Sequence, residues 1–121
     1  MAFSVDRSLI LAAEAKLGRS LPPVLRNRLA RDNGGDIRLD GEEWILFPVW
    51  DPTNRRTMAR TANHIVGETT QARTWASFPP GAVAIAGGQD GDLIVLREGR
   101  EDFELWLHDT GELVLAPSIE F

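Results

Sequence analysis

The first residues of the chain carry the apolar spacing of an amphipathic helix. Apolar side chains recur every four positions, at Val5, Leu9, Ala13 and Leu17. Residues four apart lie on one face of a helix, so this spacing predicts a helix over residues 5–17. Ser4 is the predicted N-cap, because its hydroxyl can accept a hydrogen bond from the first turn. Gly18 follows the periodic stretch and can take the left-handed conformation that ends a helix.

A second helix is predicted from Pro22 to Asp32. Proline suits the first turn of a helix, where a missing N–H costs nothing. Leu25 and Leu29 give this helix an apolar side, and we expect its three arginines to form a solvated face: Arg26, Arg28 and Arg31. The residues that end it are Asn33, Gly34 and Gly35.

Two short strands and a third helix are expected next. The strands cover residues 36–39 and 43–47 and are joined by an Asp-Gly dipeptide, which is typical of a two-residue hairpin turn. A loop at residues 51–54 leads into a stretch of helical spacing that ends near Trp75. The residues on its stripe are Ala62, Ile65, Val66, Thr69, Ala72 and Ala76.

Four strands separated by turn residues are expected in the last third of the chain. Residues 82–87 and 92–98 are the first two, and the second is apolar on both faces, as strands at the centre of a sheet are. Residues 103–109 alternate, and residues 113–117 follow a Thr-Gly-Glu turn. The order of elements predicts one α+β domain over residues 1–121, with a single, largely antiparallel six-stranded sheet and helices packed on one face.

The alternation in residues 103–109 also predicts which side chains face the helices. Phe103, Leu105 and Leu107 share one face of the strand, whereas Glu104, Trp106 and His108 share the other. If helices cover the first face, Trp106 faces outward, where it could anchor a protein partner. The alternative is that Trp106 packs under a loop, because tryptophan is usually well buried.

Composition and charge narrow the possible functions. The chain has no cysteine, which excludes disulfides, thiolate zinc sites and cysteine nucleophiles. It shows neither a signal peptide nor the roughly 18 apolar residues of a membrane span, so we expect a cytoplasmic protein without a membrane partner. Residues 1–73 hold 11 Lys or Arg and 9 Asp or Glu, a net +2, whereas residues 74–121 hold 2 and 9, a net −7. This acidic part favours a basic protein partner, although the same charge also serves solubility.

Candidate chemistry is sparse. His64 lacks a neighbouring base or nucleophile, and His108 beside Asp109 would still need a nucleophile to form a triad. Residues 87–92 resemble a calcium loop only superficially, and a tight turn between two strands explains them better. We therefore predict no catalytic residue, no metal site and no cofactor. A small hydrolase or ligand-binding protein that uses His108, Asp109 and the acidic loop stays open as an alternative.

Nucleic-acid binding is a weaker alternative, because the arginines that could carry it are spread around helices and offset by the acidic remainder. These arginines are Arg26, Arg28, Arg31, Arg55, Arg56 and Arg60.

Four motifs in order give the chain a family resemblance. They are LGRSLPPVLRNRLARDNGG, WILFP, AVAIAGGQDGDLIVL and WLHDTGE. Together they resemble the SUKH superfamily, in particular the Smi/Knr-like branch related to the yeast cell-wall-synthesis regulator. The positions that match its pattern are Leu17, Gly18, Leu21, Pro22, Asn33, Gly34, Gly35, Trp44, Gly91 and Asp92. The resemblance implies an α+β fold with one sheet and flanking helices. Members commonly continue into a final helix, and residues 118–121 look like its first turn.

The resemblance also implies a function. Many bacterial members are immunity proteins that bind and neutralise a cognate toxin, often a nuclease, and no catalytic residues carry over. A nuclease site is basic because it holds phosphate, so an acidic surface could imitate its substrate. The expected partner-binding residues are Asp90, Asp92, Glu104, Trp106, His108 and Asp109. The alternative within the same fold is a regulatory or scaffolding domain that binds a host protein.

Overall fold

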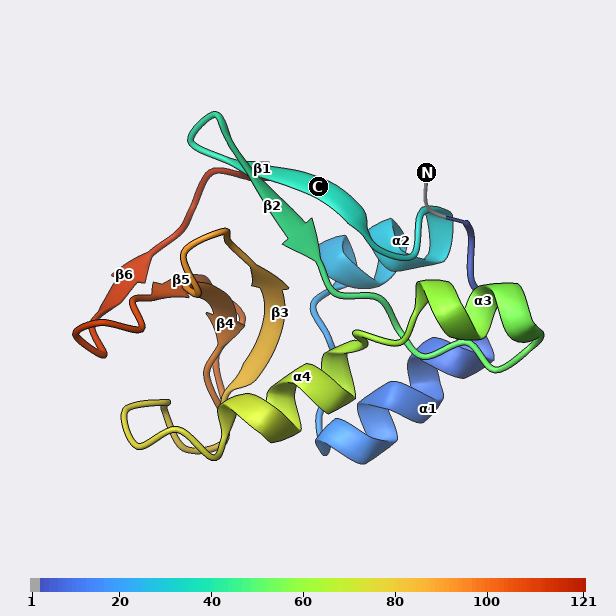
Figure 1. Ribbon diagram of the computed structural model, residues 1–121, viewed down its shortest axis with the longest axis horizontal. Coiled ribbons are helices and arrows are strands. Elements are labelled where there is room, and N and C mark those ends of the chain that lie inside the picture. Colours follow the sequence, from blue (N-terminus) through green and yellow to red (C-terminus); the bar gives the residue numbers. More distant parts are fainter. Residues whose placement is uncertain (1–2) are drawn as a thin grey trace.

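A curled antiparallel sheet and a group of helices beside it form the structure, a computed structural model that describes residues 3–121 (Figure 1). The helices within these residues are α1 (Arg7–Leu17), α2 (Pro23–Arg31), α3 (Arg55–Arg60) and α4 (Ile65–Ala72). The strands are β1 (Gly35–Leu39), β2 (Glu42–Leu46), β3 (Val83–Gly87), β4 (Leu93–Leu96), β5 (Phe103–Trp106), β6 (Leu113–Leu115) and β7 (Ile119–Glu120). The α+β class and the antiparallel sheet are therefore confirmed.

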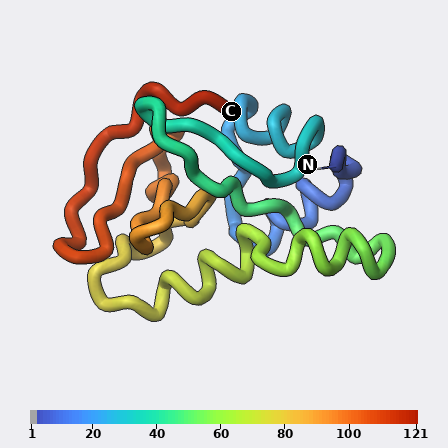
Figure 2. Tube along the Cα trace, turned by 45° about the horizontal axis from the view of Figure 1, so that its top comes forward, coloured from blue at the N-terminus to red at the C-terminus, as the bar shows by residue number. Residues whose placement is uncertain are grey.

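The sheet has seven strands rather than six, in the order β6-β5-β4-β3-β2-β1-β7. After β6 the chain crosses back to the far edge of the sheet, where β7 pairs with β1 (Figure 2). The expected first turn of a final helix at residues 118–121 is therefore wrong. Ile119 lies opposite Leu39 and Glu120 lies opposite Arg38, so the free edge of β1 draws these residues into an extended conformation.

The first helix begins two residues later than its periodicity indicates. Its N-cap is Asp6, whose carboxylate accepts the backbone N–H of Ser8 at 2.9 Å. The prediction of Ser4 is wrong, because the helix starts at Arg7 and the cap position falls on the residue just before. Gly18 ends the helix as expected, with a φ of 77° and its N–H donating to the Glu14 carbonyl at 2.9 Å.

The segment between α1 and α2 is held by two charged side chains. The buried carboxylate of Glu14 accepts the N–H of Leu21 at 2.6 Å, which fixes the entry to α2. Arg19 donates to the carbonyl oxygens of Arg97 and Arg100 at 3.1 and 3.0 Å. The helical pair is therefore joined directly to the turn between β4 and β5.

Asn33 and Gly34 attach the end of α2 to the segment after β2. The Asn33 side chain donates to the Val49 carbonyl at 2.9 Å and accepts the Val49 N–H at 2.8 Å. Gly34 has a φ of 108°, and a Cβ there would lie 3.3 Å from Pro48. These contacts explain why the chain needs an asparagine followed by a glycine at this point.

Arg28 corrects the prediction of a solvated arginine face on α2. Its side chain is buried and donates to the carbonyl oxygens of Asp32 and Asp36. Burial, partly offset by the charge of Asp32, lowers the pKa of this guanidinium. Arg28 thus ties the end of α2 to the start of β1.

The third predicted helix is two helices. Residues 61–64 interrupt the expected helix, and Asn54 caps α3 through a capping box with Thr57. His64 caps α4, with its Nδ1 atom accepting the N–H of Gly67 at 3.0 Å. A Cβ at Gly67 would lie 3.1 Å from the His64 ring, so the glycine makes room for the imidazole cap.

The centre of the sheet is the apolar β3–β4 pair, as predicted. Every residue of β4 and all but the last of β3 are buried. The register shifts between Ala84 and Ala86, and at this irregularity the Thr69 hydroxyl of α4 accepts the Ala84 N–H at 3.0 Å. The helix is therefore fixed to the middle of the sheet by a hydrogen bond as well as by packing.

The two faces of β5 are the reverse of the prediction. Trp106 is only 2% exposed and Glu104 only 4%, whereas Phe103 and Leu105 are half-buried. Trp106 stacks on Trp75 with ring centroids 5.6 Å apart and donates to the Ser77 carbonyl at 3.2 Å. The loop after α4 covers this face, so the alternative of a Trp106 packed under a loop is confirmed.

Candidate functional site

Four carboxylates line a groove between two turns at one end of the sheet. We call it the acidic groove, and its walls are formed by Glu42, Glu43, Trp44, Gly88, Gln89, Asp90, Asp92 and Leu105. Its volume is about 540 Å³. Glu42 and Glu43 open β2 after the β1–β2 hairpin, and both aspartates belong to the turn between β3 and β4.

Local turn chemistry places these carboxylates. Asp40 and Gly41 have φ values of 52° and 82°, as the predicted two-residue hairpin turn requires, so β2 begins directly with its two glutamates. In the second turn the Gly88 N–H donates to the Asp92 carbonyl at 2.9 Å. The prediction of a tight turn between two strands is therefore confirmed.

Trp44 forms the apolar floor of the acidic groove. Its side chain is buried, and a Cβ at Gly88 would lie 2.8 Å from the indole ring. Only glycine leaves room for the ring at this point, because real Cβ atoms do not approach a neighbour so closely. Trp44 is therefore part of the hydrophobic core, and the same residue shapes the surface above it.

His108 is held by two carboxylates beside the acidic groove. Its Nδ1 lies 2.7 Å from Asp92 Oδ1, which also accepts the His108 backbone N–H at 3.0 Å. Its Nε2 lies 3.0 Å from Asp109 Oδ1. The hydrogen bond with Asp92 raises the pKa of His108 and desolvation opposes this rise, while the charges of Asp109, Asp92 and Asp90 add to it.

The pKa of Asp92 shifts in the opposite direction. Burial alone would raise the pKa of its carboxyl, but the two hydrogen bonds from His108 and the imidazole charge outweigh burial and lower it. The pair therefore favours an ionised Asp92 beside a protonated His108.

The geometry around His108 bears on the hydrolase alternative. His108 and Ser77 line one shallow hollow of about 380 Å³ together with Trp75, Gly91 and Trp106. In a serine hydrolase the second imidazole nitrogen must face the serine hydroxyl. Here that nitrogen lies against Asp109. Within residues 3–121 no group of three or more His, Asp or Glu side chains is arranged to hold a metal ion.

The structure brings together part of the predicted site. Asp90, Asp92, His108 and Asp109 gather at the end of the sheet that carries the acidic groove. Glu104 and Trp106 do not join them at the surface. The Glu104 carboxylate is buried and paired with Arg97 at 2.7 and 3.1 Å, so it adds no free charge to the surface.

Sequence reasoning missed Glu42 and Glu43. The acid pair stands directly before Trp44 in the sequence, but its relation to Asp90 depends on the pairing of β2 with β3. These strands are separated by two helices along the chain, so no local pattern predicts that they are neighbours.

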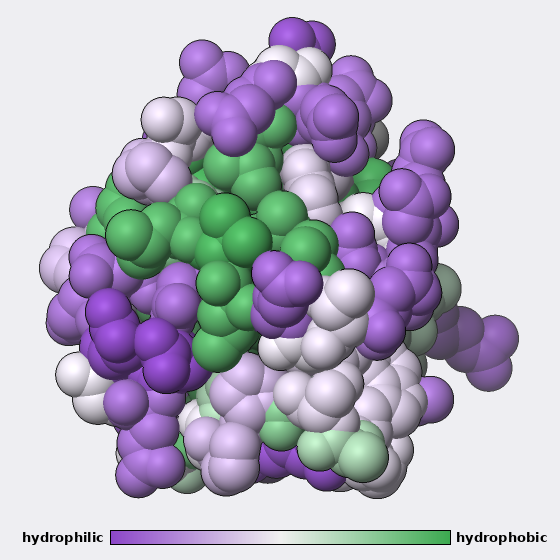
Figure 3. Space-filling model, turned by 90° about the vertical axis from the view of Figure 1, so that its left-hand side faces the viewer, coloured by the Kyte–Doolittle hydropathy of each residue, from purple (hydrophilic) through white to green (hydrophobic). Residues whose placement is uncertain are grey.

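An apolar area adjoins the acidic groove on the side of the molecule that carries β6 (Figure 3). We call it the apolar patch and define it by Leu105 and Val114, whose side chains share one face of the sheet. Val114 is 47% exposed. Leu105 lies opposite Val114 in the sheet and also lines the acidic groove, so the two surfaces are continuous.

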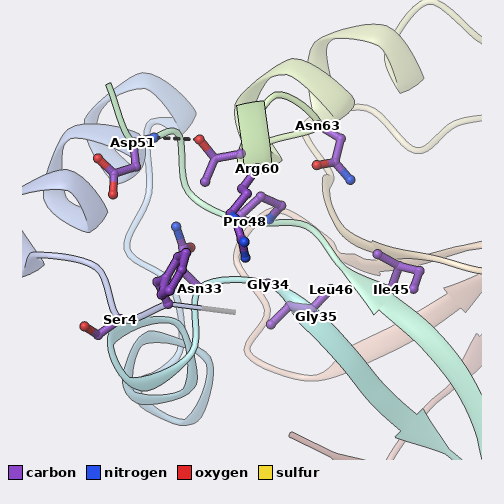
Figure 4. A pocket seen from close by; sticks show the side chains of 12 residues that line it. Ser4, Asn33, Gly34, Gly35, Ile45, Leu46, Pro48, Asp51, Arg60 and Asn63 are labelled. Carbon is purple, nitrogen blue, oxygen red and sulfur yellow. Dashed lines mark hydrogen bonds between the residues drawn. The ribbon is translucent and has the colours of Figure 1, made fainter. Parts of the chain in front are cut away.

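A second hollow is lined by polar groups that bind other parts of the chain (Figure 4). It measures about 220 Å³ and is bordered by Asn33, Asp51 and Arg60, among others. The Asn33 amide is bound to Val49, the Asp51 N–H donates to the Thr61 hydroxyl at 3.0 Å, and the Arg60 guanidinium lies 4.4 Å over the Phe3 ring. Its polar groups hold the chain together, so we do not assign it a ligand.

No helix within residues 3–121 has the length and apolar character needed to cross a membrane. Comparison with curated proteins finds no match to this chain. Comparison with protein families finds that residues 4–120 match the SMI1 / KNR4 family (SUKH-1). This match covers almost all of the sequence and agrees with the fold described above. The chain therefore belongs to the SMI1 / KNR4 family (SUKH-1).

Proposed function

We propose that this chain is a non-catalytic protein-binding module, a bacterial immunity protein that binds and neutralises a cognate toxin in the cytoplasm. The acidic groove is the observation that carries the proposal. Its four carboxylates surround a hollow with an apolar floor, which is the complement of a basic protein surface with a protruding side chain. Family membership supports the general role of the chain, and the groove supports a basic partner.

A nuclease is the toxin that this charge suits best. Its active site must attract phosphate, so it is positively charged, and an acidic partner approaches it quickly by electrostatic steering. Glu42 and Asp90 are exposed, so their field extends into solvent. Glu43 is exposed as well and lies 3.8 Å from the Arg38 guanidinium. By blocking the site that holds the nucleic acid, the immunity protein would stop the toxin without any chemical step.

The apolar patch adds the second component of a protein interface. Stable interfaces combine a desolvated apolar centre with a polar rim. Leu105 and Val114 could provide such a centre beside the acidic groove, and the groove would then be part of its rim. The second nitrogen of His108 supports binding rather than hydrolysis, because it lies against Asp109.

Co-expression with the toxin domain encoded beside this chain tests the proposal. We expect rescue of growth, a stable complex in a pull-down, and weaker association as salt rises from 50 to about 500 mM, because salt screens exposed charges. The groove variant combines Glu42→Gln with Asp90→Asn. The control variant is Asp36→Asn, which alters an exposed aspartate at the start of β1. The groove variant should associate at least tenfold more slowly, while the control should bind like the unaltered chain.

Failure of the unaltered chain to bind or rescue would contradict the proposal. Binding to a host protein in place of the toxin would support a regulatory or scaffolding role. Tight binding that is indifferent to salt and to the groove variant would remove the acidic groove from the interface.

A further inference from the structure

One edge of the sheet ends in β6, a strand with exposed apolar side chains. The strand order places β6 beside β5, and among residues 3–121 no strand lies on its other side. Its sequence is Leu-Val-Leu. Sheet edges are commonly protected by a short strand, a charged side chain, a proline or a bulge, and β6 has only the first of these, because it is three residues long.

The register shows which backbone groups of β6 face outward. It is fixed by hydrogen bonds from Leu107 N–H to the Glu112 carbonyl and from Ala116 N–H to the Phe103 carbonyl. Hydrogen-bonded positions alternate along an antiparallel pair, so Val114 exchanges its bonds with β5. The N–H and C=O groups of Leu113 and Leu115 therefore point away from β5, toward the open edge.

The charge around this edge decides what could occupy it. Residues 101–116 contain no lysine or arginine and five acidic residues, of which Glu104 is buried and paired with Arg97. The other four, Glu101, Asp102, Asp109 and Glu112, are exposed and stand before and after β5 and beside β6. Glu101 lies 3.3 Å from Arg19 and Asp109 lies 3.0 Å from His108. A second copy of this chain would bring like charges together, whereas a positively charged segment would be attracted to both ends of the strand.

We propose that an extended, positively charged segment of the partner protein adds to β6 as the next antiparallel strand of the sheet. Its backbone pairs with Leu113 and Leu115, and its basic side chains reach the acidic residues around the strand. Strand addition of this kind obtains affinity from main-chain hydrogen bonds and specificity from alternate side chains. The proposal rests on the proposed function, because it names how the toxin is held, and it places the contact at an edge rather than in the groove alone.

A proline at Leu115 tests the backbone contact. Proline has no N–H, and at an edge position whose N–H faces solvent it leaves the bonds to β5 intact. Leu115→Ala is the matched control, since it removes the same side chain but keeps the N–H. Calorimetric titration with the toxin domain encoded beside this chain should show at least a tenfold weaker affinity for Leu115→Pro than for Leu115→Ala. Equal affinities would overturn strand addition while leaving the proposed function intact.

A second measurement uses the unaltered chain and does not need the toxin. A synthetic peptide of alternating lysine and valine serves as the probe, and the same peptide with its alternate backbone nitrogens methylated serves as the control. In NMR spectra the unmethylated peptide should shift the amide protons of Leu113 and Leu115 downfield and slow their exchange with solvent. Binding elsewhere, no binding, or equal effects from both peptides would overturn the proposal. Peptide binding at β6 with no toxin binding would sink only the proposed function.

Discussion

The Asn33 side chain binds both backbone polar groups of Val49: its Nδ2 donates to the carbonyl oxygen at 2.9 Å, and its Oδ1 accepts the N–H at 2.8 Å. This pair joins the end of α2 to the chain after β2, and both partners are buried. We expect Asn33→Ala to lower the free energy of unfolding by about 3 kcal/mol, because it leaves two buried backbone groups without partners.

Urea denaturation measures this loss. Asn63 supplies the control, because it is exposed and borders the same hollow of about 220 Å³ as Asn33. Asn63→Ala should change the free energy of unfolding by about 0.5 kcal/mol or less. Equal effects of the two substitutions would contradict the structural role of Asn33.

His108 makes stability depend on pH in one direction. The bond with Asp92 raises the pKa of His108 above its ordinary value of 6.5 in the folded chain, so folding favours the protonated ring. The contribution is complete below 6.5 and is lost as pH rises through the raised pKa. An NMR titration of the ring should show a raised pKa that falls toward 6.5 in Asp92→Asn, and an unchanged pKa in that variant would disprove the coupling.

His64 makes stability depend on pH in the opposite direction. Burial first, and then the charge of Lys16, lower the pKa of His64 below 6.5, although Glu68 opposes them. The folded chain therefore favours the neutral ring, whose Nδ1 caps α4. Its contribution is complete above 6.5 and is lost as pH falls from that value through the lowered pKa.

Two substitutions separate the cap of α4 from its titration. Asparagine caps helices well and does not titrate, so His64→Asn should keep stability near neutral pH and remove this loss in acid. His64→Ala should cost about 1 kcal/mol at neutral pH. Thermal unfolding at several pH values measures both, and an acid loss that persists in His64→Asn would assign it to other groups.

Gly88 and Trp44 should be energetically coupled. Gly88→Ala forces a methyl group against the indole, with a predicted cost of about 1–3 kcal/mol. In a Trp44→Leu background the methyl group has room, so the double variant should be more stable than the sum of the single effects by about 1 kcal/mol. A double-mutant cycle in urea gives the coupling, and strict additivity would show that the ring moves freely.

The sequence predicts well those turns and strands that depend only on residues close together along the chain. The left-handed Gly18 and the Asp40–Gly41 hairpin turn follow from backbone preferences of single residues, and the apolar β4 follows from a continuous run. The break before α4 was missed because an imidazole rarely caps a helix, so His64 gave no recognised start signal.

The candidate site was only partly predictable because it depends on contacts between distant segments. The turn that carries Asp90 and Asp92 was visible in the sequence, and so was the neighbouring His108. The exposed face of β5 was not, because periodicity separates two faces but does not say which one a later loop will cover. Trp75 and Phe78, in the loop after α4, bury Trp106. The position of this loop therefore determines which face of β5 is exposed.

The contacts of Arg19 set an order in which the molecule can be assembled. Its two carbonyl acceptors lie 78 and 81 residues further along the chain. During synthesis the N-terminal helices leave the ribosome first, so this contact forms only after the β4–β5 turn has emerged. β5 and β6 follow this turn along the chain, so the acidic residues around β6 are among the last to leave the ribosome.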